Sequence, residues 1–168
     1  MITWVLGRGG LVGSSVEAKL QSRSTVWVPE SPIQWGDQSL FEESFKQAFT
    51  QFIQHIAQED WAILWCAGNG VVSSSPGDLQ REGDFINFIC SQISLLPQSL
   101  QSRGILSFAS SAGGVYGGSA GTIFSESTIT QPMNDYGFAK LKTEELLIDL
   151  AENTSTKAAI FRLANVYG

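Results

Sequence analysis

The chain alternates between short apolar runs and longer segments with helical spacing. Each apolar run has the length of a strand, and uninterrupted apolar positions are typical of strands buried on both faces of a sheet. The strands predicted in this way are Ile2–Leu6, Thr25–Val28, Trp61–Cys66, Gly104–Ala109 and Ala158–Leu163. A further short strand is predicted at Ser31–Gly36, directly after Pro29.

Between these runs, apolar residues recur every three or four positions, as they do on the buried face of a helix. The longest such segment follows Asp37, a residue type that favours the N-cap position, and continues to about Gln58. The other predicted helices are Leu11–Gln21, Leu79–Leu96 and Tyr136–Ala151, and the predicted loops are Val71–Asp78 and Ala112–Gly121.

This order of elements predicts an α/β protein with a doubly wound parallel sheet of the Rossmann type. Only one helix fits between the strands Thr25–Val28 and Trp61–Cys66, so one helix of the usual set is expected to be missing or reduced. The 168 residues have the length of one domain, and no repeat or linker divides them. We therefore expect residues 1–168 to form a single domain.

Composition excludes several classes of function. The net charge of −6 argues against nucleic acid or an anionic membrane as the main partner. No run approaches the ~20 apolar residues of a membrane span, and the first residues lack the basic start of a signal peptide. Cys66, Cys90 and the single His55 form no disulfide framework, metal-ligand cluster or serine–histidine hydrolase set. We expect a cytoplasmic protein without a metal.

A glycine-rich turn, Gly7-Arg8-Gly9-Gly10-Leu11-Val12-Gly13, joins the first strand to the first helix. In such a turn Gly7 allows the tight bend, Gly10 lets the backbone approach a pyrophosphate, and Gly13 lets the helix pack closely on the strand. The free N–H groups at the helix start favour negative charge. The spacing indicates a dinucleotide site; a plain strand–helix turn is the structural alternative.

Two residues near this turn favour different cofactors. Glu30 follows the second strand, where an acidic residue binds an adenosine ribose and favours NAD. Arg8 could bind the 2′-phosphate of NADP. Either residue could instead be a solvated surface charge, so NAD and NADP both stay open. Of the five tryptophans, most are expected in the core, and Trp35 could lie near an adenine.

The reacting groups are predicted later in the chain, on one helix and directly after two strands. Tyr136 and Lys140 are four residues apart and share one face of a helix, where an ammonium can stabilise a phenolate for acid/base work. Ser110 and Ser111 follow a strand whose carboxyl end should face the cofactor crevice, and one of them is expected to cap local backbone instead. Ala67 and Gly68 end another strand, where small residues leave room for a cofactor or simply form a tight turn.

Together these residues resemble the extended short-chain dehydrogenase/reductase family, in the branch of NAD-dependent nucleotide-sugar epimerases and dehydratases. The resemblance covers nearly the whole chain. Its most specific positions are Ser110-Ser111, Val115-Tyr116-Gly117, Glu126, Pro132, Tyr136-Gly137, Lys140, Glu144, Arg162 and Asn165-Val166-Tyr167-Gly168.

The resemblance implies NAD or NADP as cofactor and hydride transfer at a carbon of a nucleotide sugar. It implies that Tyr136 is the catalytic acid/base, that Lys140 holds the nicotinamide ribose and tunes the tyrosine, and that Ser111 is their hydroxyl partner. Asn165 would reach toward the substrate. It also suggests a homodimer through the helices that include Leu79–Leu96 and Tyr136–Ala151.

Four departures refine this expectation. One is that the commonest position of the family's serine falls on Ala112 rather than on Ser111. The dehydratase branch has an acidic pair where this chain has Ala112, Gly113 and Gly114, which favours epimerisation or carbonyl reduction. The short region after the second strand is similar to deoxysugar reductases and fucose synthases. Family members continue past the final Val-Tyr-Gly into a smaller substrate domain, so we expect this chain to bind dinucleotide but to turn over substrate poorly. A reductase of another carbonyl compound and a non-catalytic dinucleotide-binding module are the alternatives.

Overall fold

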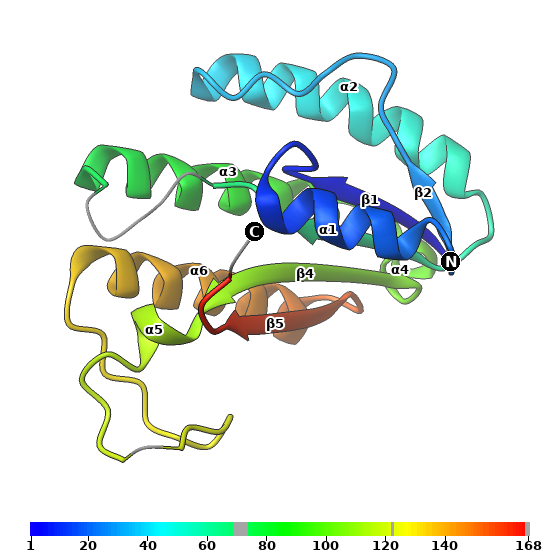
Figure 1. Ribbon diagram of the computed structural model, residues 1–168. Coiled ribbons are helices and arrows are strands. Elements are labelled where there is room, and N and C mark those ends of the chain that lie inside the picture. Colours follow the sequence, from blue (N-terminus) through cyan, green and yellow to red (C-terminus); the bar gives the residue numbers. More distant parts are fainter. Residues whose placement is uncertain (69–73, 122, 167–168) are drawn as a thin grey trace.

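A computed structural model describes residues 1–68, 74–121 and 123–166, which form a five-stranded parallel sheet with helices on both faces (Figure 1). The strand order is β2-β1-β3-β4-β5. The strands are β1 Ile2–Leu6, β2 Thr25–Trp27, β3 Trp61–Trp65, β4 Gly104–Ser111 and β5 Lys157–Leu163. Because the chain runs outward from β1 to β2 and then crosses to β3, the sheet has a switch point between β1 and β3, where α/β proteins form their binding crevice. The predicted doubly wound sheet is confirmed.

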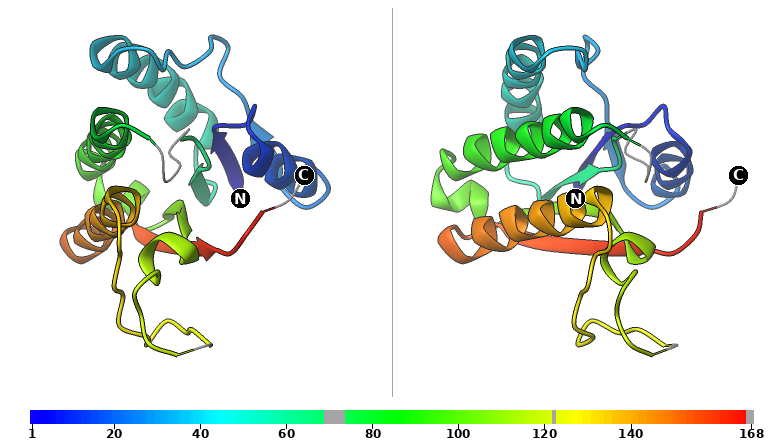
Figure 2. Two further views of the ribbon diagram at one scale, coloured as in Figure 1. Left: turned by 60° about the vertical axis from the view of Figure 1, so that its left-hand side comes forward. Right: turned by 90° about the vertical axis from the view of Figure 1, so that its left-hand side faces the viewer.

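The helices lie unevenly on the two faces. Their bounds are α1 Leu11–Leu20, α2 Gln38–Ile56, α3 Pro76–Ser94, α4 Gln98–Gln101, α5 Ala112–Val115 and α6 Asp135–Asn153. Figure 2 shows α2, α3 and α6 together on one face of the sheet and α1 on the other. In the part of the chain that the structure describes, no helix is long and apolar enough to cross a membrane.

The connection from β2 to α2 differs from the sequence prediction. Ser31–Gly36 forms no strand, because Pro29 and Pro32 lack N–H donors and the backbone N–H of Gln34 donates to Ser44 Oγ of α2 at 3.0 Å. Asp37 caps α2 as predicted, accepting hydrogen bonds from the Ser39 and Leu40 backbone, and α2 alone bridges β2 to β3.

Two predicted loops are partly helical. Ala112–Val115 forms the short helix α5, because the Ser111 side chain caps its start. Of the predicted loop Val71–Asp78, residues 71–73 lie outside the described residues and Pro76 already begins α3. Ser75 caps that helix, and a proline in its first turn is compatible with helical backbone.

An aromatic core fixes the strands that form the crevice. The Trp4 ring of β1 stacks on Phe45 of α2 with ring centroids 5.2 Å apart, and Phe41 stacks on Phe85 of α3 at 4.0 Å. Trp4, Trp61 and Trp65 are buried, as predicted for core tryptophans. This packing holds the carboxyl ends of β1 and β3 side by side against α2 and α3.

Candidate active site

The glycine-rich turn packs β1 tightly against the start of α1. Gly7 has a φ of +86°, and a Cβ on it would overlap the backbone of Cys66 and Ala67. A Cβ on Gly13 would overlap the Gly7 carbonyl. Gly10 is the N-cap of α1 and no side chain caps this end, so the first N–H groups of the helix are available to an anion.

A cavity runs from this turn along the end of β3. It has a volume of about 520 Å³, and its lining includes Gly7, Gly9 and Gly10 from the turn together with Ala67 and Gly68. The structure thus places both predicted groups of cofactor-binding residues on one cleft. The shape of this cleft fits a dinucleotide, because a cofactor can approach the backbone closely where the residues have small side chains or none.

A second cavity, of about 310 Å³, is lined by the two residues that could select between NAD and NADP at the adenosine ribose. Arg8 and Glu30 both line it, and Trp35 lines this cavity and the first. The Arg8 guanidinium donates to both carboxylate oxygens of the buried Glu17, at 2.8 and 2.5 Å. Glu30 is exposed and accepts a hydrogen bond from Gln51 at 3.3 Å. Both selectors therefore face the same space, Arg8 as part of an ion pair.

The predicted reacting groups meet in a third pocket of about 180 Å³. Ser111, Tyr136 and Lys140 line it together, along with Val12 of the first helix. The Lys140 Nζ lies 5.5 Å from the centroid of the Tyr136 ring. A Cβ on Gly137 would overlap the Gly114 carbonyl, so this glycine allows α6 to approach α5 and brings Tyr136 to the pocket.

The two serines have different partners. Ser110 is buried and its hydroxyl donates to Glu144 Oε1 at 2.5 Å. Ser111 Oγ accepts the backbone N–H of Gly114 at 3.1 Å, and both serines line the pocket. Because the cap uses Ser111 as an acceptor, its O–H proton is left to donate toward a bound oxygen. Ser111 is thus the better placed of the two for chemistry.

Two predicted positions lie at the margin of the site. Leu11 is 50% exposed at the start of α1. Asn165 is exposed after β5, between Ala164 and Val166, which both line the third pocket. Tyr167 and Gly168, which complete the closing motif, lie outside the described residues.

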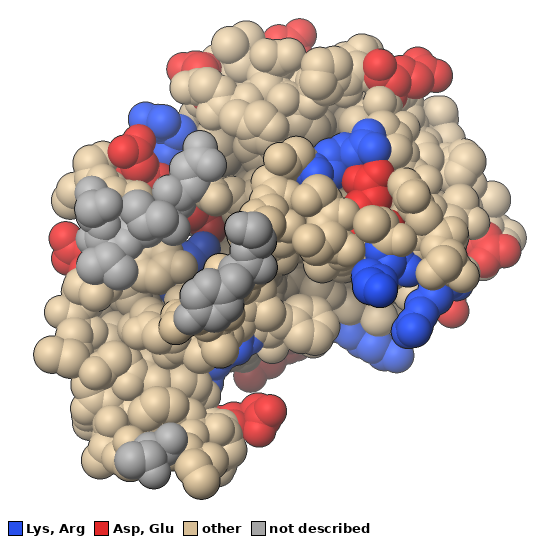
Figure 3. Space-filling view, in the orientation of Figure 1, with Lys and Arg blue, Asp and Glu red and all other residues tan. Residues whose placement is uncertain are grey.

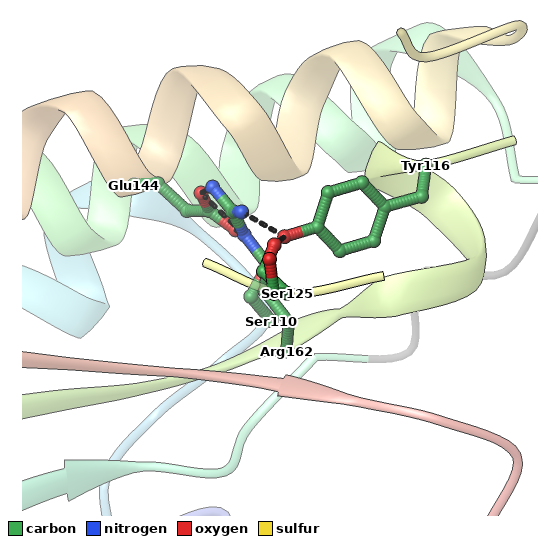
Figure 4. Close-up of polar contacts among 5 residues, drawn as sticks. All are labelled: Ser110, Tyr116, Ser125, Glu144 and Arg162. Atoms are coloured by element: carbon green, nitrogen blue, oxygen red, sulfur yellow. Dashed lines mark hydrogen bonds and ion pairs between the residues drawn. The ribbon is translucent and has the colours of Figure 1, made fainter. Parts of the chain in front are cut away.

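A polar network behind the pocket joins β4, β5 and α6 to the segment that follows α5 (Figure 4). The Arg162 side chain of β5 donates to the Glu144 carboxylate of α6 at 2.6 and 3.1 Å, and it also donates to the Tyr116 hydroxyl. Tyr116 in turn donates to the carbonyl of Ser125 at 2.9 Å. The hydrogen bonds that Arg162 donates to Glu144 raise the pKa of Arg162 above its ordinary range, so this cation stays charged wherever the protein is folded.

Sequence reasoning missed Asp78 and Glu82, two carboxylates that line the cleft. Glu82 of α3 lines the 520 Å³ cavity and accepts a hydrogen bond from Lys140 Nζ at 2.7 Å. No local pattern marks Glu82, because the contact depends on how closely α3 packs against α6.

Cys66 lines the cleft but should react slowly. Burial raises the pKa of its thiol from an ordinary 9.0 to about 11, so the thiolate is about 100-fold rarer at neutral or mildly alkaline pH. We expect alkylation by iodoacetamide at about pH 8 to be ~100-fold slower than that of a free peptide thiol. Mass spectrometry, with Cys66→Ser to assign the modified peptide, measures this. Labelling at the peptide rate would contradict the burial.

The fold and the crevice define an α/β protein of the Rossmann type, and comparisons with known proteins identify the family. The sequence model of the NAD dependent epimerase/dehydratase family matches residues 3–168. The chain belongs to this family. A search of curated proteins gives no match.

Several solved structures share the fold. RMD from Pseudomonas aeruginosa, solved with NADPH, is 21% identical with a TM-score of 0.73, over 98% of this chain and 55% of its own. UDP-glucose 4-epimerase from Thermotoga maritima, solved with UDP-glucose, is 21% identical with a TM-score of 0.70, over 100% of this chain and 57% of its own. For UDP-glucuronic acid 4-epimerase from Bacillus cereus, solved with NAD, the values are 18%, 0.66, 100% and 57%. The chain thus spans little more than half the length of these proteins.

Proposed function

We propose that the chain is the NAD(P)-binding part of a nucleotide-sugar epimerase or reductase in which Tyr136 is the acid/base. One observation carries the proposal: Ser111, Tyr136 and Lys140 line a pocket that shares Cys66, Ala67 and Gly68 with the cleft at the glycine-rich turn. A dinucleotide with its phosphates at the turn would have its reactive ring toward this pocket. Family membership and nucleotide-sugar epimerases among the structural neighbours support the substrate class.

The cleft residues divide the binding of NAD(P) among them. The N–H groups at the start of α1 would hold the pyrophosphate, and Gly7, Gly10 and Gly13 keep that surface free of side chains. Ala67 and Gly68 would lie along the middle of the cofactor, and Glu30 or Arg8 would contact the adenosine ribose. When bound, the nicotinamide accepts or donates hydride.

The remaining residues would carry out proton transfer to and from the substrate. The Tyr136 phenol would exchange a proton with the sugar oxygen whose carbon is oxidised or reduced, while the Ser111 O–H donates to the same oxygen. Lys140 would orient the ring and hold the ribose. Ala112, Gly113 and Gly114 supply no carboxylate for the loss of water, which favours epimerisation or carbonyl reduction over dehydration.

An interface between copies is a second part of the proposal. A groove of about 350 Å³ lies between α3 and α6, and its lining includes Leu79, Leu146 and the exposed Phe138. Exposed apolar side chains beside such a groove favour a homodimer through these two helices.

Parallel titrations with NADH and NADPH test the proposal. Energy transfer from the tryptophans to the reduced nicotinamide should saturate with at least one of them, since Trp35 and Trp65 line the cleft. The tighter cofactor identifies Glu30 or Arg8 as the selector. Gly13→Val is the matched control: its side chain would enter the turn, and binding should be lost while far-UV circular dichroism is retained. No saturation with either cofactor by the unaltered chain would refute the proposal.

A further inference from the structure

The cations that face the cleft are already paired with carboxylates. Among the described residues that line the three cavities, Arg8 is bound by Glu17, Arg81 lies 3.5 Å from Asp78, and Lys140 is bound by Glu82. On the face in Figure 3, acidic and basic side chains lie intermixed. The cleft therefore presents little uncompensated positive charge.

The Lys140–Glu82 pair differs from the other two in its position and burial. The two side chains are only 9% and 10% exposed, and the Nζ–Oε1 distance is 2.7 Å. Lys140 lines the pocket of the reacting groups, and Glu82 lines the adjoining cofactor cleft, so the pair lies between the two. Solvent screens a buried pair of this kind poorly.

The backbone just after β3 leaves room for this carboxylate. Gly68 has a φ of +123°, and a Cβ on it would lie 2.6 Å from Glu82 Oε2. Any side chain at position 68 would therefore displace the Glu82 carboxylate. The ammonium also lies 5.0 Å from the centroid of the Phe108 ring. Lys140 is held in place by a carboxylate and by aromatic faces.

On the basis of the proposed function, we propose that Glu82 sets the preference of the site between oxidised and reduced cofactor. The oxidised nicotinamide ring carries one positive charge and the reduced ring carries none. An uncompensated ammonium at Lys140 would repel only the oxidised ring. By neutralising Lys140, Glu82 allows the oxidised form to bind, and it is a specificity-determining residue rather than a catalytic one.

Calorimetric titration with the oxidised and the reduced form of the better-binding cofactor tests this role. Glu82→Gln should raise the ratio of the two dissociation constants, oxidised over reduced, about tenfold, equivalent to about 1.4 kcal/mol. Glu145→Gln removes an exposed carboxylate on α6 that lines none of the three cavities; it is the matched control and should leave the ratio unchanged. In Lys140→Met with Glu82→Gln the ratio should return toward that of the unaltered protein, because neither charge is then present.

Glu82→Asp keeps the charge but draws it away from Nζ. It should give an intermediate ratio, and it serves as the test if the Gln variant does not fold. An unchanged ratio in a folded variant that binds both forms would overturn the role of Glu82 and leave the proposed function standing. Failure of the unaltered protein to bind either form would overturn both.

Discussion

Replacing Tyr136 with phenylalanine is expected to lower the rate of hydride transfer about 10²–10⁴-fold, the usual contribution of a positioned acid/base. The phenylalanine ring keeps the contacts of the tyrosine, which packs beside Gly114 so closely that a Cβ there would lie 3.1 Å from the ring. The variant should therefore lose the hydroxyl proton but keep the fold and the affinity for cofactor. The measurement is the single-turnover change in nicotinamide absorbance when the cofactor-bound protein is mixed with a UDP-sugar.

Cofactor titration of Tyr136→Phe distinguishes an enzyme from a non-catalytic dinucleotide-binding module. An enzyme should keep its dissociation constant and lose its rate, whereas a binding module has no rate to lose.

Lys140→Met and Lys142→Met form a matched pair, because Lys142 is exposed on the same helix. The first should weaken cofactor binding and the second should not. A fully active Tyr136→Phe protein would exclude Tyr136 as the acid/base.

Replacing Glu144 with glutamine is expected to destabilise the chain by about 3–5 kcal/mol, the usual effect of leaving one partner of a buried ion pair uncompensated. Glu144 is only 1% exposed, and it accepts hydrogen bonds from Ser110 and Arg162. A loss of this size is a large part of the 5–15 kcal/mol that stabilises a typical domain. Urea unfolding followed by circular dichroism measures it.

Two further variants show whether the effect comes from the pair. Glu145→Gln makes the same chemical change at the adjacent, exposed position and should alter the free energy of unfolding by less than about 0.5 kcal/mol. In Glu144→Met with Arg162→Met, much of the stability should return, since no buried charge is then unpaired. A Glu144→Gln variant as stable as the unaltered protein would show that the pair contributes nothing.

The polar network around Glu144, which stabilises the fold, lies directly beside the pocket of the reacting groups. In the register of β4 and β5, Ser110 pairs with Arg162, and the neighbouring Ser111 lines the pocket. Glu144 follows Lys140 by one turn of α6. Through its hydrogen bonds from Ser110 and Arg162, the Glu144 carboxylate thus holds β4 and β5 against α6 beside the reacting groups.

Much of the fold follows from periodicity, and the failures have local causes. Continuous apolar runs such as Trp61–Cys66 predicted strands that the structure confirms. The strand predicted at Ser31–Gly36 does not form, because its apolar residues do not compensate for prolines, which lack the backbone N–H needed to hydrogen-bond a neighbouring strand. The helix at Ala112–Val115 does not follow from the sequence pattern because its three small residues carry no helical periodicity, and a serine such as Ser111 bonds a backbone N–H three residues on in turns as well as in helix caps.

The sequence by itself determined the doubly wound sheet, the glycine-rich turn and the meeting of Ser111, Tyr136 and Lys140, because each depends on local spacing and on the rule that parallel strands end at one edge. Only the tertiary structure decided that Glu82 pairs with Lys140, that Glu17 pairs with Arg8, and that Ser110 rather than Ser111 is bound to Glu144. These contacts depend on the distance between helices and strands far apart in the chain, and side-chain packing, rather than spacing along the sequence, sets that distance.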